Sequence, residues 1–138
     1  TPGFKGWRCN AGYGAGFDKV VAYVRQNIPA GDSIFIYPDM TMMYGAADRP
    51  SYKGAPFIFQ LKVCPPDGFV KDRFRESFMI SPPMWIIEHQ PPELADRIEP
   101  GELLSWLGLS DFVAGHYATH WEWKDFKILR RRPEKEKP

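Results

Sequence analysis

The sequence has few cysteines and no long run of uncharged apolar residues. Its 138 residues include only two cysteines, Cys9 and Cys64, which are too few for a disulfide framework and lack the spacing of a metal or redox motif. We expect two separate thiols, with a single bridge in an oxidising compartment as the alternative. No segment approaches the roughly 18 apolar residues that a membrane-spanning helix needs. The chain as given is therefore expected to be soluble.

An N-terminal targeting segment is also missing from the sequence. The chain starts at Thr1, without methionine and without the charged and apolar regions of a signal peptide. We expect such a start in a fragment excised from a longer protein.

A large excess of charge of either sign is absent as well. The 18 Lys and Arg nearly balance the 17 Asp and Glu, so no global field favours nucleic acid or cations. Residues 130–138 are a local exception, with five positive and two negative charges. This end is expected to be solvated, and contact with anionic lipid is the alternative.

Proline and glycine, by contrast, are abundant. The 14 prolines and 12 glycines interrupt the chain too often for a bundle of long helices. The hydrophobic fraction of 43% suffices for one core. We expect a Gly-rich lead-in over 1–16, a single domain over 17–132 and a charged tail over 133–138.

Apolar periodicity predicts the elements of this domain. Apolar residues recur at the spacing of one helical face from Phe17 to Ile28, which predicts a helix over 17–27 that Pro29 ends. The apolar run at 33–37 predicts a strand covered on both faces.

Later segments repeat this pattern of helix, proline break and short strand. The further expected elements are a helix over 40–47, a helix opened by 65–67 and ended by 81–83, a strand over 84–88, helices over 101–107 and 110–115 with Ser110 as N-cap, and a hairpin of strands 117–123 and 126–131. Residues 57–63 are compatible with either a helix or a strand. The expected fold is a single-domain α/β sandwich: a short mixed, mainly parallel sheet flanked by helices, with a C-terminal antiparallel hairpin.

One polar cluster follows the first predicted strand. Asp39, Tyr44, Arg49 and Tyr52 come after the carboxyl end of 33–37, where open α/β sheets bind ligands. Their side chains could orient a sugar or a phosphate by charge-assisted hydrogen bonds. The alternative is structural: Asp39 caps a helix, Arg49 pairs with it, and the tyrosines pack in the core.

Two tryptophans form a second candidate site. Trp121 and Trp123 share one face of the predicted strand 117–123, where they could stack on a carbohydrate or belong to the core. His116 and His120 are four residues apart but lack an HExxH context. No GxSxG nucleophile motif is present, and no catalytic or metal-ligating residue is predicted.

The order of four segments resembles a known family. These segments are 27–37 (NIPAGDSIFIY), 43–50 (MYGAADRP), 81–87 (SPPMWII) and 117–131 (YATHWEWKDFKILRR). Together they resemble the C-terminal extracytoplasmic domain of polytopic membrane glycosyltransferases. The group is the dolichyl-phosphate-mannose-protein mannosyltransferase type, with its bacterial relatives that use polyprenyl-phosphate sugars. The resemblance covers about residues 17–132.

The resemblance implies an accessory role rather than catalysis. In that family, transfer depends on acidic residues in a loop after the first transmembrane helix, with a divalent metal in some members. No such helix or loop exists in this chain, so no catalytic residue and no cofactor is transferred to it. The resemblance implies a domain tethered on the periplasmic or exterior face of the membrane. Its partners would be the transmembrane part of the parent chain and a lipid-linked sugar or glycan acceptor, without nucleic acid.

Two alternatives remain open from the sequence. One is a carbohydrate-binding module that uses Trp121 and Trp123. The other is a small independent α/β hydrolase, which needs a histidine close to a serine or cysteine and a carboxylate.

Overall fold

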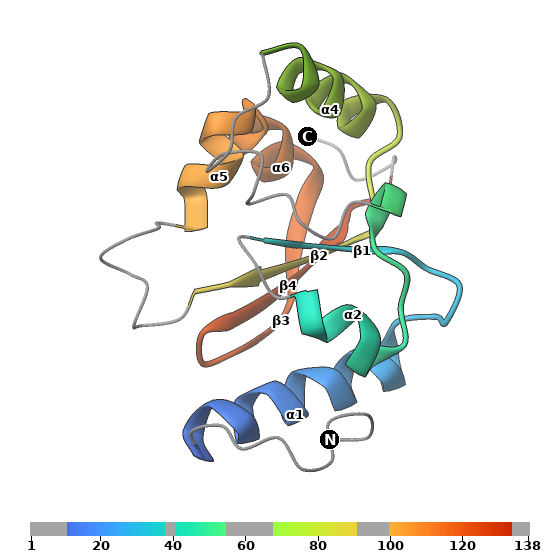
Figure 1. Cartoon of the computed structure of the whole chain (residues 1–138), viewed down its shortest axis with the longest axis vertical. Helices are drawn as coiled ribbons and strands as arrows, with labels where there is room; N and C mark the ends of the chain where they lie inside the picture. Colours follow the sequence, from blue (N-terminus) through green and yellow to red (C-terminus); the bar gives the residue numbers. More distant parts are fainter. Residues whose placement is uncertain (1–10, 38–40, 55–67, 91–99, 134–138) are drawn as a thin grey trace.

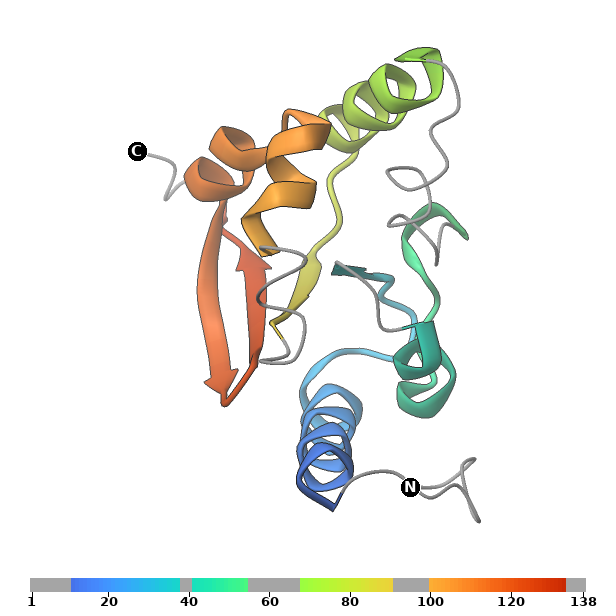
Figure 2. The same ribbon diagram turned by 60° about the vertical axis from the view of Figure 1, so that its left-hand side comes forward.

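A four-stranded sheet with helices on both faces forms the centre of the molecule (Figures 1 and 2). The computed structural model describes residues 11–37, 41–54, 68–90 and 100–133. Its elements are α1 (Ala11–Asn27), β1 (Ile34–Tyr37), α2 (Thr41–Ala47), the 3-10 turn η1 (Tyr52–Gly54), α4 (Gly68–Ile80), β2 (Trp85–His89), α5 (Pro100–Leu107), α6 (Ser110–His116), β3 (Tyr117–Trp123) and β4 (Phe126–Arg131).

The strand order is β1-β2-β4-β3, which confirms the mixed α/β sheet with a C-terminal hairpin. β1 and β2 are parallel, whereas the β2–β4 and β3–β4 pairs are antiparallel. Antiparallel pairs thus outnumber the single parallel pair in this sheet. The returning strand β4 takes the central place because its Ile128 and Leu129 are both buried, one on each face of the sheet.

Helix α1 begins earlier than its apolar pattern predicts. It starts at Ala11 rather than at 17, so the expected lead-in loop over 1–16 is wrong for its last six residues; residues 1–10 lie outside the described residues. Glycine is a poor helix former, which hides this first part in the sequence. Gly16 has a packing role instead, because a Cβ there would lie 3.1 Å from the ring of Trp123.

Helices α1 and α2 cover one face of the sheet (Figure 1). The predicted apolar stripe of α1 is buried against strand residues such as Ile36, Ile87 and Ile128. The expected helix over 40–47 is confirmed by α2, which adds Met43 and Ala47 to the same cluster. Burial of these side chains, at roughly 1.5–3 kcal/mol each for the larger ones, holds this layer together.

Helices α4, α5 and α6 cover the opposite face. Phe35, Tyr52, Phe74 and Phe78 form an aromatic cluster there, with ring centroids 5.4–6.4 Å apart. Ser110 is not the N-cap of α6 as expected: Leu109 occupies that position and no side chain caps the helix. Among the described residues, no helix is both long and apolar enough to cross a bilayer. The ambiguous segment 57–63 lies outside them.

Candidate functional site

The guanidinium of Arg49, one of the predicted ligand residues, is hydrogen-bonded to backbone carbonyls of the chain itself. Its side chain is 8% exposed and donates hydrogen bonds to Ile28 O (2.6 and 3.1 Å) and Arg25 O (3.2 Å) at the end of α1. It also donates to Ala47 O (3.1 Å) and Asp48 O (2.8 Å) at the end of α2. Arg49 therefore caps two helix C-termini, where free carbonyls and the helix dipole favour a cation.

The predicted tyrosines are not brought together. Tyr44 belongs to the core on the α1 side of the sheet, and its hydroxyl accepts a hydrogen bond from Ile36 N (3.1 Å). Tyr52 belongs to the opposite core and donates its hydroxyl to Ser81 O. Burial raises the pKa of Tyr52 to about 12. Asp39 lies outside the described residues, so its predicted pairing with Arg49 has no observation.

A hollow remains near two of these residues. It has a volume of about 490 Å³ and is lined by Ala30, Tyr44, Gly45, Asp48, Arg49 and Pro50. Because the guanidinium of Arg49 is directed at five backbone contacts, this hollow offers a ligand little directed charge.

The two tryptophans are packed on the α1 side. Trp121 stacks on Tyr23 with centroids 4.3 Å apart and planes 15° apart. The ammonium groups of Lys19 and Lys124 lie 4.8 and 4.6 Å from the ring centroid of Trp123. Trp121 therefore packs against the core on the α1 side, whereas Trp123 contacts two lysine side chains and is not among the core residues.

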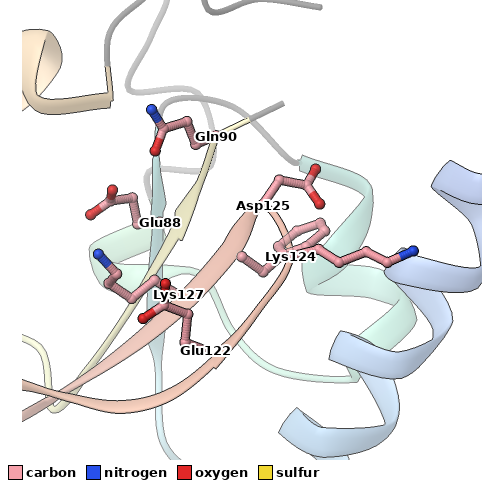
Figure 3. Close-up of a pocket in the computed structure, with 7 residues that line it drawn as sticks. Glu88, Gln90, Glu122, Lys124, Asp125 and Lys127 are labelled. Atoms are coloured by element: carbon pink, nitrogen blue, oxygen red, sulfur yellow. The ribbon is translucent and has the colours of Figure 1, made fainter. Parts of the chain in front are cut away.

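A different cavity lies where β1 and β2 end. It has a volume of about 440 Å³ and opens beside the turn of the β3–β4 hairpin (Figure 3). Its described lining residues are Glu88, Gln90, Glu122, Lys124, Asp125, Phe126 and Lys127. The carboxyl end of parallel strands is the usual ligand position of open α/β sheets, so this cavity is the candidate functional site.

Four polar residues form a row across the sheet at this cavity. Tyr37 pairs with Glu88, Glu88 with Lys127, and Lys127 with Glu122, one from each strand. Directly paired residues project from the same face of a sheet. Figure 3 shows Glu88, Lys127 and Glu122 at neighbouring positions on that face. We refer to Glu88, Lys127 and Glu122 as the charged row.

Tyr37 orients the first member of the charged row. Its hydroxyl donates a 2.7 Å hydrogen bond to Glu88 Oε2, and the ring is 1% exposed. Burial, followed by the charge and hydrogen bond of Glu88, raises the pKa of Tyr37 well above its ordinary value. The phenol therefore stays protonated as a donor and restrains the carboxylate.

A histidine–carboxylate pair connects the end of β2 to the hairpin turn beside the cavity. His89 Nε2 lies 3.1 Å from Asp125 Oδ2, and the imidazole stacks on Phe126 at 4.3 Å. Gln90 N donates to Asp125 O at 2.7 Å. His89 is only 3% exposed, so a substrate cannot reach this imidazole without rearrangement. The pair positions the hairpin turn beside the cavity.

The charged row suits binding of a hydroxyl-rich ligand. Its carboxylates accept hydrogen bonds and its ammonium donates them, so both kinds of group face the same space. Serine, cysteine and histidine are absent from the described lining residues, and no three described His, Cys, Asp or Glu residues converge as a metal site requires. The described lining thus offers groups for recognition but no thiol or hydroxyl nucleophile.

Sequence reasoning missed every member of the charged row. Glu88, Lys127 and Glu122 come from three strands, and only the pairing registers bring them together. The alternation of side chains along the strand 117–123 did predict one feature of the site. It places Glu122 on the opposite face of the sheet from Trp121 and Trp123. Cys9 and Cys64 lie outside the described residues.

No protein-family model, curated protein or solved structure is significantly similar to this chain.

Proposed function

We propose that this chain is a non-catalytic accessory domain of a membrane glycosyltransferase that uses a polyprenyl-phosphate sugar. In this proposal the domain binds the sugar of an acceptor or lipid-linked donor in the cavity at the charged row. The four segments that resemble the family motivate the parent enzyme. The observation that carries the binding site is the charged row itself, which places two carboxylates and one ammonium along one open cavity.

The position of the cavity supports a binding role. Tyr37 and Glu88 stand at the ends of the two parallel strands, on rigid backbone rather than on a long loop. Rigid placement lowers the entropic cost of ordering side chains around a ligand. The Tyr37–Glu88 hydrogen bond adds to this preorganisation.

The charge of the cavity supports a neutral polyhydroxylated ligand over a polyanion. Its charged row carries the carboxylates of Glu88 and Glu122 against the ammonium group of Lys127, whereas the Asp125 carboxylate pairs with His89 and the Lys124 ammonium lies over the ring of Trp123. A strongly anionic ligand would meet net repulsion there. Sugar hydroxyls can donate to the carboxylates and accept from the lysine at the same time.

Calorimetric titration with manno-oligosaccharides tests this site. We expect the unmodified chain to bind them, and Lys127→Gln and Glu122→Gln each to weaken binding roughly tenfold, because each removes a hydrogen bond to a charged group. Glu76→Gln is the matched control, since Glu76 is exposed on α4 and should leave the affinity unchanged. Equal affinity of all four proteins would refute the assigned site.

The non-catalytic part of the proposal has its own test. The isolated chain, incubated with a polyprenyl-phosphate mannose and a peptide or lipid acceptor, should transfer no sugar. Transfer above the rate without protein would make this domain an enzyme and overturn the proposal.

A further inference from the structure

A second hollow lies at the other end of the β3–β4 hairpin. Figure 2 shows the hairpin turn at one end of these strands and α6 at the other. The hollow has a volume of about 280 Å³ and lies at the α6 end. Its lining residues are Ala118, Thr119, His120, Arg130, Arg131, Arg132 and Pro133. Lys127 of the sugar cavity and Arg131 are separated by about 13 Å along β4, so the two sites are distinct.

Three consecutive arginines give this hollow a positive charge. Arg130 is exposed, and its guanidinium lies 5.3 Å from the ring centroid of Trp85. Arg131 donates to Pro82 O (2.9 Å) and Arg132 to Gly115 O (3.4 Å). The acceptors in these contacts are backbone carbonyls. Because a carbonyl has no net charge, the positive charges of the arginines are not neutralised by them.

The described carboxylates do little to neutralise the positive charges of the three arginines. Across the four described segments, no carboxylate forms an ion pair with Arg130, Arg131 or Arg132. Asp32 accepts a 3.0 Å hydrogen bond from the indole nitrogen of Trp85, the ring beside the Arg130 guanidinium. With three arginines and no carboxylate paired to them, the described part of this surface is cationic.

Large apolar side chains are exposed on the segment 79–84, whose backbone Arg131 contacts at Pro82 and Met84. Ile80 is 84% exposed, Met79 49% and Met84 37%. Met84 O accepts a 2.9 Å hydrogen bond from Arg131 N, and Ile80 is two residues before Pro82, which Arg131 also contacts. Exposed large hydrophobic residues on the segment that contacts a cationic strand favour an interaction surface.

We propose that this end of the domain docks on an anionic lipid bilayer. Arg130 and Arg132 would contact lipid phosphates while Ile80 and Met84 enter the boundary between headgroups and acyl chains. Cationic residues next to exposed apolar residues are the pattern of membrane-interface surfaces. A soluble phosphate would use the arginines but not Ile80, Met79 or Met84, so the apolar neighbours favour the bilayer as the partner.

This inference does not depend on the proposed sugar site. Docking through Arg130, Arg132 and Ile80 would leave the charged row at the other end of β4 open to solvent. The two proposals therefore fail or succeed separately.

Vesicle flotation with the full chain tests the docking surface. The chain should float with vesicles of phosphatidylcholine and phosphatidylglycerol, and much less with phosphatidylcholine alone. Arg130→Gln combined with Arg132→Gln should weaken binding by roughly 20- to 30-fold, since each basic residue near such a surface contributes a factor of about five. Ile80→Ser, at a largely exposed position, should weaken binding several-fold without risk to the fold.

Two comparisons make the test decisive. Lys127→Gln removes a charge at the opposite end of β4 and should float as the unmodified chain does, while the double arginine variant should keep its affinity for manno-oligosaccharides. Full flotation of the double arginine and Ile80→Ser variants would overturn the inference, as would no flotation of the unmodified chain. Displacement from vesicles by millimolar glycerol phosphate would also overturn it, because the ligand would then be a soluble phosphate.

Discussion

Arg49 shows how a residue that looks functional can serve the fold. Its pattern in the sequence, a cation close to two tyrosines after a strand, is that of a ligand site. In the structure its guanidinium binds carbonyls of Arg25, Ile28, Ala47 and Asp48. Only the planar fork of arginine can serve carbonyls in several directions at once. The residue holds the ends of α1 and α2 together.

This role predicts that even a conservative change at Arg49 is harmful. Arg49→Lys keeps the charge but loses most of the five contacts, so the free energy of unfolding should fall by about 2–4 kcal/mol. Urea denaturation followed by circular dichroism measures it. Arg25→Lys is the control, since Arg25 is exposed and contributes only its carbonyl. Similar stability of both variants would show that Arg49 does not cap the helices.

At the scale of elements, three tyrosine hydroxyls connect segments that are distant in sequence. Tyr37 joins β1 to Glu88 of β2, Tyr52 joins η1 to Ser81 after α4, and Tyr117 joins β3 to Pro83 before β2. Burial raises the pKa of all three phenols, with Glu88 adding to the effect at Tyr37. The contacts require protonated hydroxyls.

These contacts predict a loss of stability at alkaline pH. A raised folded-state pKa means that the unfolded chain loses its tyrosine protons first, so the contribution is complete below pH 10 and declines above it. For Tyr52 the decline spans pH 10.0 to about 12. Each such tyrosine lowers the unfolding free energy by at most about 1.4 kcal/mol per pH unit.

Urea denaturation at a series of pH values, from about two units below to about 1.5 units above the ordinary tyrosine pKa of about 10, measures this decline. Tyr52→Phe should be less stable at neutral pH but should lose stability less steeply above pH 10, because it has no phenol to ionise there. A stability that stays flat over the alkaline range, or parallel curves for the two proteins, would contradict the role of these hydroxyls.

At the scale of the whole molecule, local patterns predicted the elements but not the site. The apolar stripe of 17–28 and the alternation of 117–131 are visible in the sequence because they depend on short-range periodicity. The charged row depends instead on which strands pair and in what register, information that no single segment contains. Placing Glu122 beside Lys127 needs the hairpin, and placing Lys127 beside Glu88 needs β4 at the centre of the sheet.

In the sequence, the tryptophans of β3 and the tyrosines after β1 resemble ligand-binding residues. Tyr44 and Tyr52 belong to the two cores and Trp121 packs against one of them, and a sequence does not distinguish an aromatic residue that packs from one that binds. Opposite faces of one sheet separate Tyr44 from Tyr52, although only eight positions separate them in the chain.

Mapping of backbone amide shifts by NMR during titration with a manno-oligosaccharide tests the central claim most directly. The account predicts saturable shifts at Glu88, Gln90, Glu122 and Lys127, the described lining of the cavity at the ends of β1 and β2. Shifts confined to Trp121 and Trp123, or no shifts at saturating sugar, would contradict it.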